Sequence, residues 1–269
     1  SHIFSFLTLS DYHKTRQVSS SWECCFAQGV YHAHFAENTS SPDVCHHLQA
    51  DFPGIHSFWI SCNVLLRHFV EDPDWREDEI RELVVDCVLP KPLLARLFQL
   101  LDKQLKMYSL TFSKKCTGVL DLDSAVGLHT LERLSLFEIR LSPVQVEKLA
   151  CWMENLAQLH VLDLRRCGLT ESSVPVLERG LRGTSKQLQV LRLAGNKLGG
   201  SGLLMLAEVL TGFEQLNFLD VAATGADDGH ALQKILLDCA SMRTLDASRS
   251  VKSPIHISPF HESVLPHAK

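Results

Sequence analysis

The chain has 269 residues, of which 45% are hydrophobic and 21% are charged, so it is long and apolar enough to form a sizeable core. Its formal net charge of −5 disfavours nucleic acid as a partner. The sequence has no apolar run as long as the roughly 18 residues that a transmembrane helix needs, so we expect no membrane partner.

Short helices are predicted for the first thirty residues. An apolar cluster opens the chain and consists of Ile3, Phe4, Phe6 and Leu7. Ser10 and Asp11 can cap a following helix. The run Ser19–Ser21 interrupts this pattern, and Trp22 begins the next apolar group.

The order of these residues is similar to the F-box family, whose pattern runs I-F-S-[YF]-L, D-L, a basic residue, V and W. The matching positions are Ile3-Phe4-Ser5-Phe6-Leu7, Asp11-Tyr12, Arg16, Val18 and Trp22. The resemblance implies docking on a Skp-type adaptor. The adaptor-binding residues that it implies are Ile3, Phe4, Phe6, Leu7, Leu9, Tyr12, Val18 and Trp22.

The segment 1–36 departs from the F-box pattern in two ways. Family members usually carry Leu-Pro and an acidic residue before I-F-S, whereas this chain starts at Ser1 without Met, so we expect a fragment or a processed chain. Ser20 and Ser21 also stand where the family often has a basic residue. The alternative for this segment is a helical cap over the first unit of a solenoid.

A connector is predicted over 37–51, in a region that is rich in histidine. The candidate metal ligands are His32, His34, Cys45, His46, His47, His56 and Cys62. Their spacing is irregular for a zinc site, so we expect no metal and no cofactor.

The sequence has neither a P-loop nor a G-x-S-x-G elbow, and we expect no enzyme activity and no catalytic residue.

A leucine pattern repeats from Phe52 to Ser250. In its clearest form it reads L-x-x-L-x-L-x-x-[CN]-x-L. The second leucine of the frame recurs at Leu134, Leu162, Leu191, Leu219 and Leu245, at intervals of 28, 29, 28 and 26 residues. A fixed period in this range predicts a solenoid of about seven or eight units, each of which buries its apolar face against its neighbours.

Each unit is predicted to be one strand followed by one helix. The L-x-x-L-x-L part alternates as a half-buried strand does. The Cys167 and Asn196 side chains lie at the turn that follows, where they can satisfy backbone groups. Ser142 and Pro143 are helix-start signals before the next apolar-periodic stretch.

Upstream, three further frames fit the pattern less well. One consists of Ile80, Leu83, Val85 and Val88, and is followed by a helix-like stretch from Pro92 to Leu105. A second uses Leu105, Tyr108 and Leu110. A weaker copy uses Phe52, Ile55, Ser57 and Ile60, in which polar Ser57 would take a buried position.

These repeats resemble the leucine-rich-repeat family, and the stretch 188–206 resembles its ribonuclease-inhibitor-type subclass. The resemblance implies an α/β solenoid with parallel strands on the concave face and helices on the convex face. Together with an F-box it implies the substrate receptor of an SCF-type ubiquitin ligase, with a Skp-type adaptor, a cullin scaffold and an unknown protein substrate as partners. The alternative is a leucine-rich-repeat scaffold or inhibitor that binds a protein on its concave face.

The predicted binding surface follows from strand alternation, because residues between buried leucines point to the concave side. The middle position of successive units holds Ser135, Asp163, Arg192, Asp220 and Asp246. Two residues further on stand Phe137, Arg165, Ala194, Ala222 and Ser248. The predicted substrate-binding residues are Phe137, Asp163, Arg165, Arg166, Arg192, Asp220 and Asp246. Phe137 and Arg165 are the expected anchors, and the alternative is a self-satisfied ladder of salt bridges.

The cysteines and the C-terminal stretch are two further features of the sequence. The nine cysteines show no framework spacing, and Cys87, Cys151, Cys167 and Cys239 fall inside repeats. Reduced core thiols are the simplest interpretation and favour a cytoplasmic or nuclear location. The stretch 251–269 is rich in Pro and His and is expected to be a flexible tail.

Overall fold

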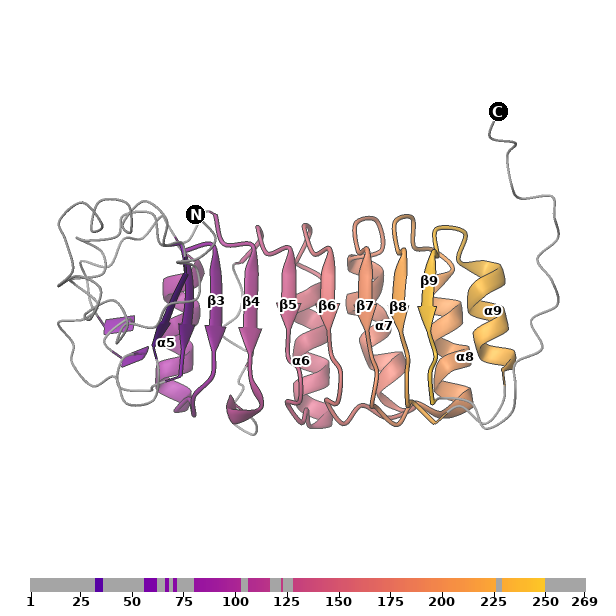
Figure 1. Ribbon diagram of the computed structural model, residues 1–269, viewed down its shortest axis with the longest axis horizontal. Coiled ribbons are helices and arrows are strands. Elements are labelled where there is room, and N and C mark those ends of the chain that lie inside the picture. Colours follow the sequence, from indigo (N-terminus) through magenta and orange to yellow (C-terminus); the bar gives the residue numbers. More distant parts are fainter. Residues whose placement is uncertain are drawn as a thin grey trace, which may run out of the picture.

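A computed structural model describes residues 32–35, 56–61, 66–67, 70–71, 80–102, 106–116, 122, 128–225 and 229–249. Within these ranges nine strands form one parallel sheet, and their order in the sheet is their order in the chain (Figure 1). The strands are β1 (His32–Phe35), β2 (Ser57–Ile60), β3 (Glu82–Val85), β4 (Ser109–Phe112), β5 (Arg133–Ser135), β6 (Val161–Asp163), β7 (Val190–Arg192), β8 (Phe218–Asp220) and β9 (Thr244–Asp246).

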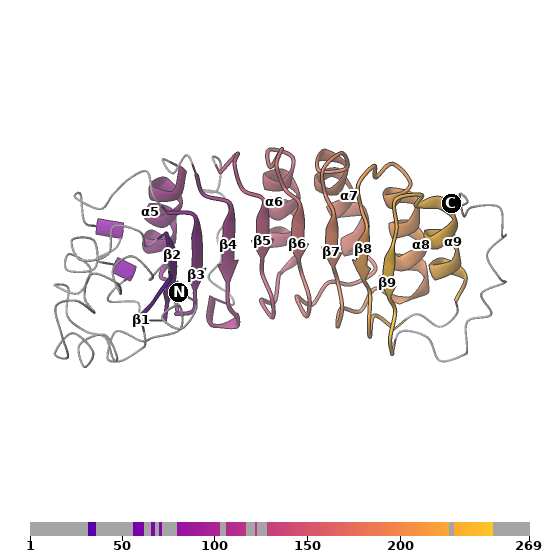
Figure 2. The same cartoon turned by 45° about the horizontal axis from the view of Figure 1, so that its top comes forward.

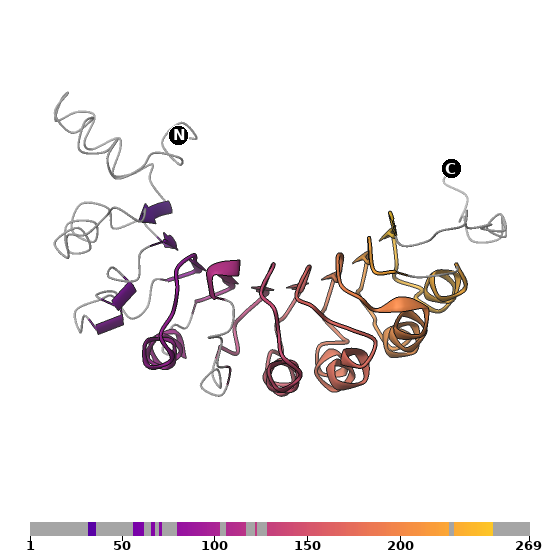
Figure 3. The same ribbon diagram turned by 90° about the horizontal axis from the view of Figure 1, so that it is seen from below.

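Helices cover one face of this sheet. The described helices are α5 (Lys91–Asp102), α6 (Pro143–Met153), α7 (Ser173–Gly183), α8 (Gly199–Leu210) and α9 (His230–Asp238), with a 3-10 turn, η2 (Lys114–Cys116), after β4. Seen from below, the strands line the inner side of an arc and the helices lie on its outer side (Figure 3). The tilted view in Figure 2 shows the strands running side by side along the arc. The predicted α/β solenoid is thereby confirmed for the described repeats.

Strand register places the repeated leucines in one row. Leu134 pairs with Leu162, Leu162 with Leu191, and Leu191 with Leu219. All four side chains are at most 1% exposed and point toward the helices. Burial of one leucine side chain stabilises a fold by about 1.5–3 kcal/mol, so this row holds adjacent units together.

Helix α6 starts where Ser142 and Pro143 predict a helix start. The Ser142 side chain accepts a hydrogen bond from the Gln145 backbone N–H, and the Gln145 side chain accepts one from the Ser142 N–H. Pro143 follows in the first turn, where its missing N–H leaves no bond unmade. This capping box fixes the point at which the chain turns onto the convex side.

Buried side chains satisfy the backbone at the turns after β6, β7 and β8, as the sequence predicts for Cys167 and Asn196. Asn196 is 2% exposed; its Oδ1 accepts from the Leu169 N–H at 3.0 Å, and its Nδ2 donates to the carbonyls of Leu164 and Leu193. In neighbouring units the Cys167 thiol donates to the Leu136 carbonyl, and the Thr224 hydroxyl donates to the Val221 carbonyl.

The two upstream frames that contain Tyr108 and Ile55 are wrong. Leu110 pairs with Leu83, so Leu110 and Phe112 are the buried strand residues, while half-buried Tyr108 donates a hydrogen bond to Glu82. Phe58 likewise pairs with Leu83, which shifts the β2 frame by three residues. The frames were misassigned because an aromatic residue replaces leucine at these buried positions.

The sheet also extends upstream of Phe52. Strand β1 pairs in parallel with β2 and lies within the segment 1–36 that resembles an F-box. Eight of the described strands, β2 to β9, lie between 52 and 250. The tail 251–269 and the connector 37–51 lie outside the described residues.

The cysteine prediction needs one correction. Cys87, Cys167 and Cys239 are buried as free thiols, but Cys151 is exposed. Cys151 lies on α6 between the buried residues Ala150 and Trp152, and its own side chain faces away from the core.

None of the described helices has the length and apolar content needed to cross a membrane.

Candidate protein-binding face

The concave face is built by the strand residues that alternate with the buried leucines. Register pairs Ser135 with Asp163, Asp163 with Arg192, Arg192 with Asp220, and Asp220 with Asp246. We call this line of side chains the middle row. Neighbouring strands lie about 4.8 Å apart, so charges of opposite sign alternate along much of the row at close range. The register therefore agrees with the row of residues that strand alternation predicts.

Asp163 is the centre of an ion-pair network. Its side chain is only 6% exposed, and its Oδ2 lies 2.6 Å from Arg165 Nη2 and 3.7 Å from Arg192 Nη1. The Arg165 Nε also donates to Asp163 Oδ1 at 2.9 Å. These hydrogen bonds from Arg165 to the carboxylate raise the pKa of the guanidinium above its usual value. Asp163 thus orients Arg165 through several hydrogen bonds and lies within ion-pair distance of Arg192.

Each of the two arginines also lies over an aromatic ring. The Arg165 Cζ is 5.0 Å from the centroid of the Phe137 ring, and the Arg192 Cζ is 5.8 Å from the centroid of Phe218. The two arginine side chains keep 35% and 39% of their surface exposed. Arginine and aromatic side chains are enriched among the residues that dominate protein–protein binding energy. The two Arg–aromatic pairs are therefore the candidate anchors of this face.

The three aspartates of the middle row also shape their own turns. A side-chain oxygen of Asp163 accepts from the Arg165 N–H, and Asp220 and Asp246 accept in the same way from Ala222 and Ser248. This bond to the backbone two residues ahead is an Asx turn. Asp220 is 8% exposed, whereas Asp246 is exposed. Asp246 and Arg192 thus offer more surface to a partner than Asp163 and Asp220 do.

Arg166 lies apart from the other residues that are predicted to bind a substrate. Its Nη1 lies 2.7 Å from Glu138 Oε1, and its backbone has a φ of +56°. Glu138, Gly195, Ala223 and Arg249 take the same left-handed conformation in their own units. The Arg166 side chain is 65% exposed at the edge of the concave face.

Sequence reasoning missed a second row of concave residues. Val161, Val190 and Phe218 are in register and half-buried beside the middle row. These residues precede the second leucine of each frame, and the alternation rule applied in that direction would have found them. Trp59, 47% exposed, occupies the position on β2 that continues the middle row toward the N-terminal end. Val161, Val190 and Phe218 thus form a short apolar strip beside the charged residues, and Trp59 adds an aromatic side chain to the middle row itself.

In the N-terminal half the polar side chains bind one another. Glu82 accepts hydrogen bonds from Ser57 at 2.8 Å and from Tyr108 at 2.6 Å. Burial and the bond to Glu82 raise the pKa of Tyr108 to about 12. Asp86 pairs with Lys115 at 3.3 Å. Apart from the exposed Trp59, the polar side chains of this half are paired with one another, which leaves the Arg–aromatic pairs as the stronger candidates for contact.

The predicted adaptor-binding residues lie outside the described part of the chain. They are Ile3, Phe4, Phe6, Leu7, Leu9, Tyr12, Val18 and Trp22. Four of the seven candidate metal ligands lie outside it as well, namely Cys45, His46, His47 and Cys62. Among the described residues no three His, Cys, Asp or Glu side chains are grouped as a metal site would need.

No protein-family model matches this chain. No curated protein matches it either. The solved structures similar to it include the yeast Rad7–Elc1 complex, with a TM-score of 0.50 and 15% identity over 82% of this chain and 64% of that one. An internalin, InlF, from Listeria monocytogenes gives a TM-score of 0.42 at 17% identity, over 74% of this chain and 56% of that one. TLR13 in complex with ssRNA13 gives 0.47 at 15% identity, over 86% and 34% of the two chains.

The match with the chain in the Rad7–Elc1 structure covers less than two thirds of that chain's length. At this level of identity the likeness concerns the fold alone. Repeats of about 28 residues, parallel strands on the inner side and helices on the outer side are the features of leucine-rich repeats. The described part of the chain therefore has the leucine-rich-repeat fold.

Proposed function

We propose that this chain is the substrate-recognition subunit of an SCF-type ubiquitin ligase. The repeats would hold a protein substrate on the concave face, and residues 3–26 would dock a Skp-type adaptor that joins a cullin scaffold. No residue of the chain would be catalytic, because such a receptor works by raising the effective concentration of a substrate lysine near the ubiquitin donor. The complex would act in the cytoplasm or the nucleus.

The observation that carries the binding part of this proposal is the pair of Arg–aromatic contacts on the concave face. Arg165 over Phe137 and Arg192 over Phe218 are half-exposed, and both arginines form ion pairs with Asp163. Side chains that are already ordered lose less entropy when a partner binds. The similar Rad7 structure is itself a complex with another protein, Elc1.

The ligase part rests on the order of residues from Ile3 to Trp22. Its test is a pull-down of the Skp-type adaptor and the cullin with the chain carrying its native upstream residues. A Leu7→Ala, Trp22→Ala double variant should lose the adaptor. A Phe137→Ala, Arg165→Ala double variant is the matched control, because it should keep the adaptor and lose the substrate.

The runner-up function is a leucine-rich-repeat scaffold or inhibitor that binds one protein on its concave face. It is favoured by the fact that the concave anchors need no F-box. Recovery of a concave-face partner without any adaptor, from an intact folded chain, would support this function and contradict the ligase.

A further inference from the structure

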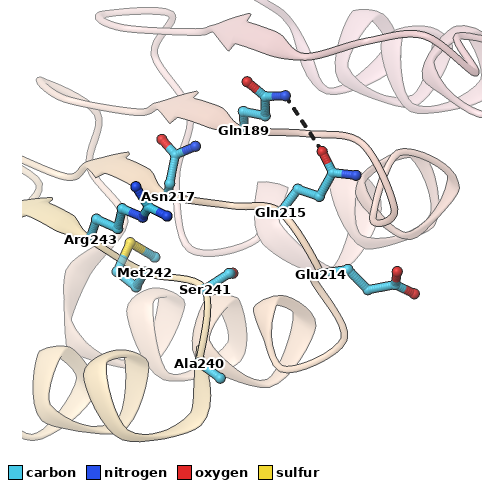
Figure 4. A pocket seen from close by; sticks show the side chains of 8 residues that line it. All are labelled: Gln189, Glu214, Gln215, Asn217, Ala240, Ser241, Met242 and Arg243. Carbon is cyan, nitrogen blue, oxygen red and sulfur yellow. Dashed lines mark hydrogen bonds between the residues drawn. The ribbon is translucent and has the colours of Figure 1, made fainter. Parts of the chain in front are cut away.

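A polar cavity lies at one lip of the solenoid, beside the last three described units. Its volume is about 440 Å³, and it is formed by the loops that lead into β7, β8 and β9 (Figure 4). Gln189, Asn217 and Arg243 stand directly before these strands. The Asn217 N–H donates to the Gln189 carbonyl at 2.9 Å, and the Arg243 N–H donates to the Asn217 carbonyl at 3.0 Å. The repeat thus sets these three side chains in successive units; we call the cavity the lip pocket.

The floor of the lip pocket is held by the backbone. The Ser241 hydroxyl donates to the carbonyls of Phe213 and Leu216, which binds the loop before β9 to the loop before β8. The Met242 side chain is half-buried and adds an apolar surface. The two loops that precede β8 and β9 are therefore joined at the base of the pocket.

Several polar groups in the lip pocket have little or no partner. The Gln189 Nε2 approaches Gln215 Oε1 at 3.5 Å, at the limit of a hydrogen bond (Figure 4). Among the described residues, none forms a hydrogen bond with the Asn217 side chain or an ion pair with Arg243. Arg243 lies next to Asn217, at the end of the pocket away from Glu214 (Figure 4). An exposed guanidinium beside a row of amides is an available site for an acidic group.

We propose that the lip pocket binds an extended peptide segment of a partner protein, with an Asp or Glu side chain on Arg243. Side-chain amides offer both donors and acceptors, as peptide backbone groups do, so Gln189, Gln215 and Asn217 match the backbone of such a segment. A guanidinium binds a carboxylate through two parallel hydrogen bonds. The inference goes beyond the proposed function, because it concerns a second surface and needs neither the adaptor nor the concave anchors.

Methionine NMR offers a direct readout. The chain has four methionines, and Met242 lines the lip pocket whereas Met107 and Met153 are fully buried elsewhere. A random-peptide display library is panned on the full chain, and an enriched peptide is added to protein labelled with ¹³C at the methionine methyl groups. A Met242→Leu variant identifies the Met242 signal.

We expect the enriched peptides to contain Asp or Glu and to shift the Met242 signal while the signals of Met107 and Met153 stay in place. Arg243→Gln should weaken binding about tenfold or more, since it removes a charged hydrogen-bond partner. Lys197→Gln is the matched control, because Lys197 is an exposed cation in the turn after β7 rather than in the loop before it, and this variant should bind as the wild type does. An unchanged urea midpoint for Arg243→Gln verifies that this variant folds.

Three results would overturn the proposal: no enriched peptide, an enriched peptide that leaves the Met242 signal unmoved, or equal binding by Arg243→Gln and the wild type. None of them bears on adaptor recovery, which is measured with residues 3–26. Failure of the lip pocket is thus distinguishable from failure of the ligase proposal.

Discussion

Arg165 and Asp163 form a two-bond contact on the concave side of β6, with Nη2 to Oδ2 at 2.6 Å and Nε to Oδ1 at 2.9 Å. The same carboxylate accepts the Arg165 backbone N–H at 3.1 Å. One acidic side chain therefore orders both the turn after the strand and the guanidinium that lies over Phe137.

Asp163→Asn should lower the free energy of unfolding by about 1 kcal/mol, because the Asx turn can remain while the ion pair with the partly exposed Arg165 is lost. It should also weaken binding of a concave-face partner, since Arg165 becomes free to rotate. Urea unfolding and partner titration measure the two effects. Glu138→Gln is the control, because it breaks only the exposed pair with Arg166 and should change stability by less than about 0.5 kcal/mol. Equal effects of the two substitutions would contradict a special role for Asp163.

Asn196→Ala should be among the most destabilising changes at a turn. It removes the partners of three buried backbone groups, at Leu164, Leu169 and Leu193. We expect a loss of about 3 kcal/mol, against about 1 kcal/mol for Thr224→Ala, which removes the single bond to Val221. Chemical denaturation of both variants measures the difference. A loss at Asn196 no larger than that at Thr224 would mean that water replaces the amide at this turn.

Exchanging glycine and alanine in the turns after β7 and β8 should change the stability of the fold in opposite directions. Gly195 and Ala223 occupy the same place in consecutive units, with φ of +72° and +53°. A Cβ on Gly195 would also lie 2.7 Å from Arg166 Cγ. Gly195→Ala should destabilise by about 1 kcal/mol or more, whereas Ala223→Gly should stabilise by up to about 1 kcal/mol, because glycine accepts the left-handed region without strain.

Ala222→Gly is the control for this pair, because Ala222 is not among the residues with a positive φ. It should lose stability, since glycine adds only unfolded-state entropy at that position. Thermal unfolding ranks the three variants. A stabilised Ala222→Gly, or a destabilised Ala223→Gly, would disagree with the conformations described here.

Alkaline pH should destabilise the solenoid through its buried thiols. Burial raises the pKa of Cys116 and of Cys167 from 9.0 to about 12. The unfolded chain therefore loses these protons first, and the stability that the protonated thiols provide is full below pH 9 and lost as the pH rises toward 12. Each thiol should contribute a decline of about 1.4 kcal/mol per pH unit within that window.

A Cys116→Ala, Cys167→Ala double variant separates this effect from the titration of lysine and tyrosine. It should be less stable than the wild type at neutral pH, because two buried side chains are truncated. Its free energy of unfolding should nevertheless decline less steeply above pH 9. Urea titrations in reducing buffer at several pH values measure both slopes, and equal slopes would rule the thiols out as the cause.

Cys151 should be alkylated in the native state before the other described thiols. It is exposed on α6, while Cys87, Cys116, Cys167 and Cys239 are buried. Iodoacetamide treatment followed by peptide mass spectrometry measures the order of reaction, and a denatured sample shows the unprotected rates. Early modification of Cys167 in folded protein would contradict the packing of its unit.

The sequence alone determined the repeating part of this protein. From Leu134 to Leu245 the leucines recur so regularly that strand, turn, helix and register all follow from spacing, because each unit can bury its apolar face only against a copy of itself. The middle row of the concave face follows from the same alternation. The pattern was insufficient at β2 and β4, where Phe58 and Phe112 fill leucine positions.

Only the tertiary structure decided how the side chains of different units combine. Spacing places Asp163, Arg165 and Arg192 on one face, but the two-bond contact depends on the orientation of each rotamer. The exposure of Cys151 depends on the way α6 packs against its neighbours. Gln189, Asn217 and Arg243 hold equivalent positions of the repeat, so the spacing sets them in successive units. Only the structure shows that these side chains line one pocket together with Ser241 and Met242, because the loop conformations decide that.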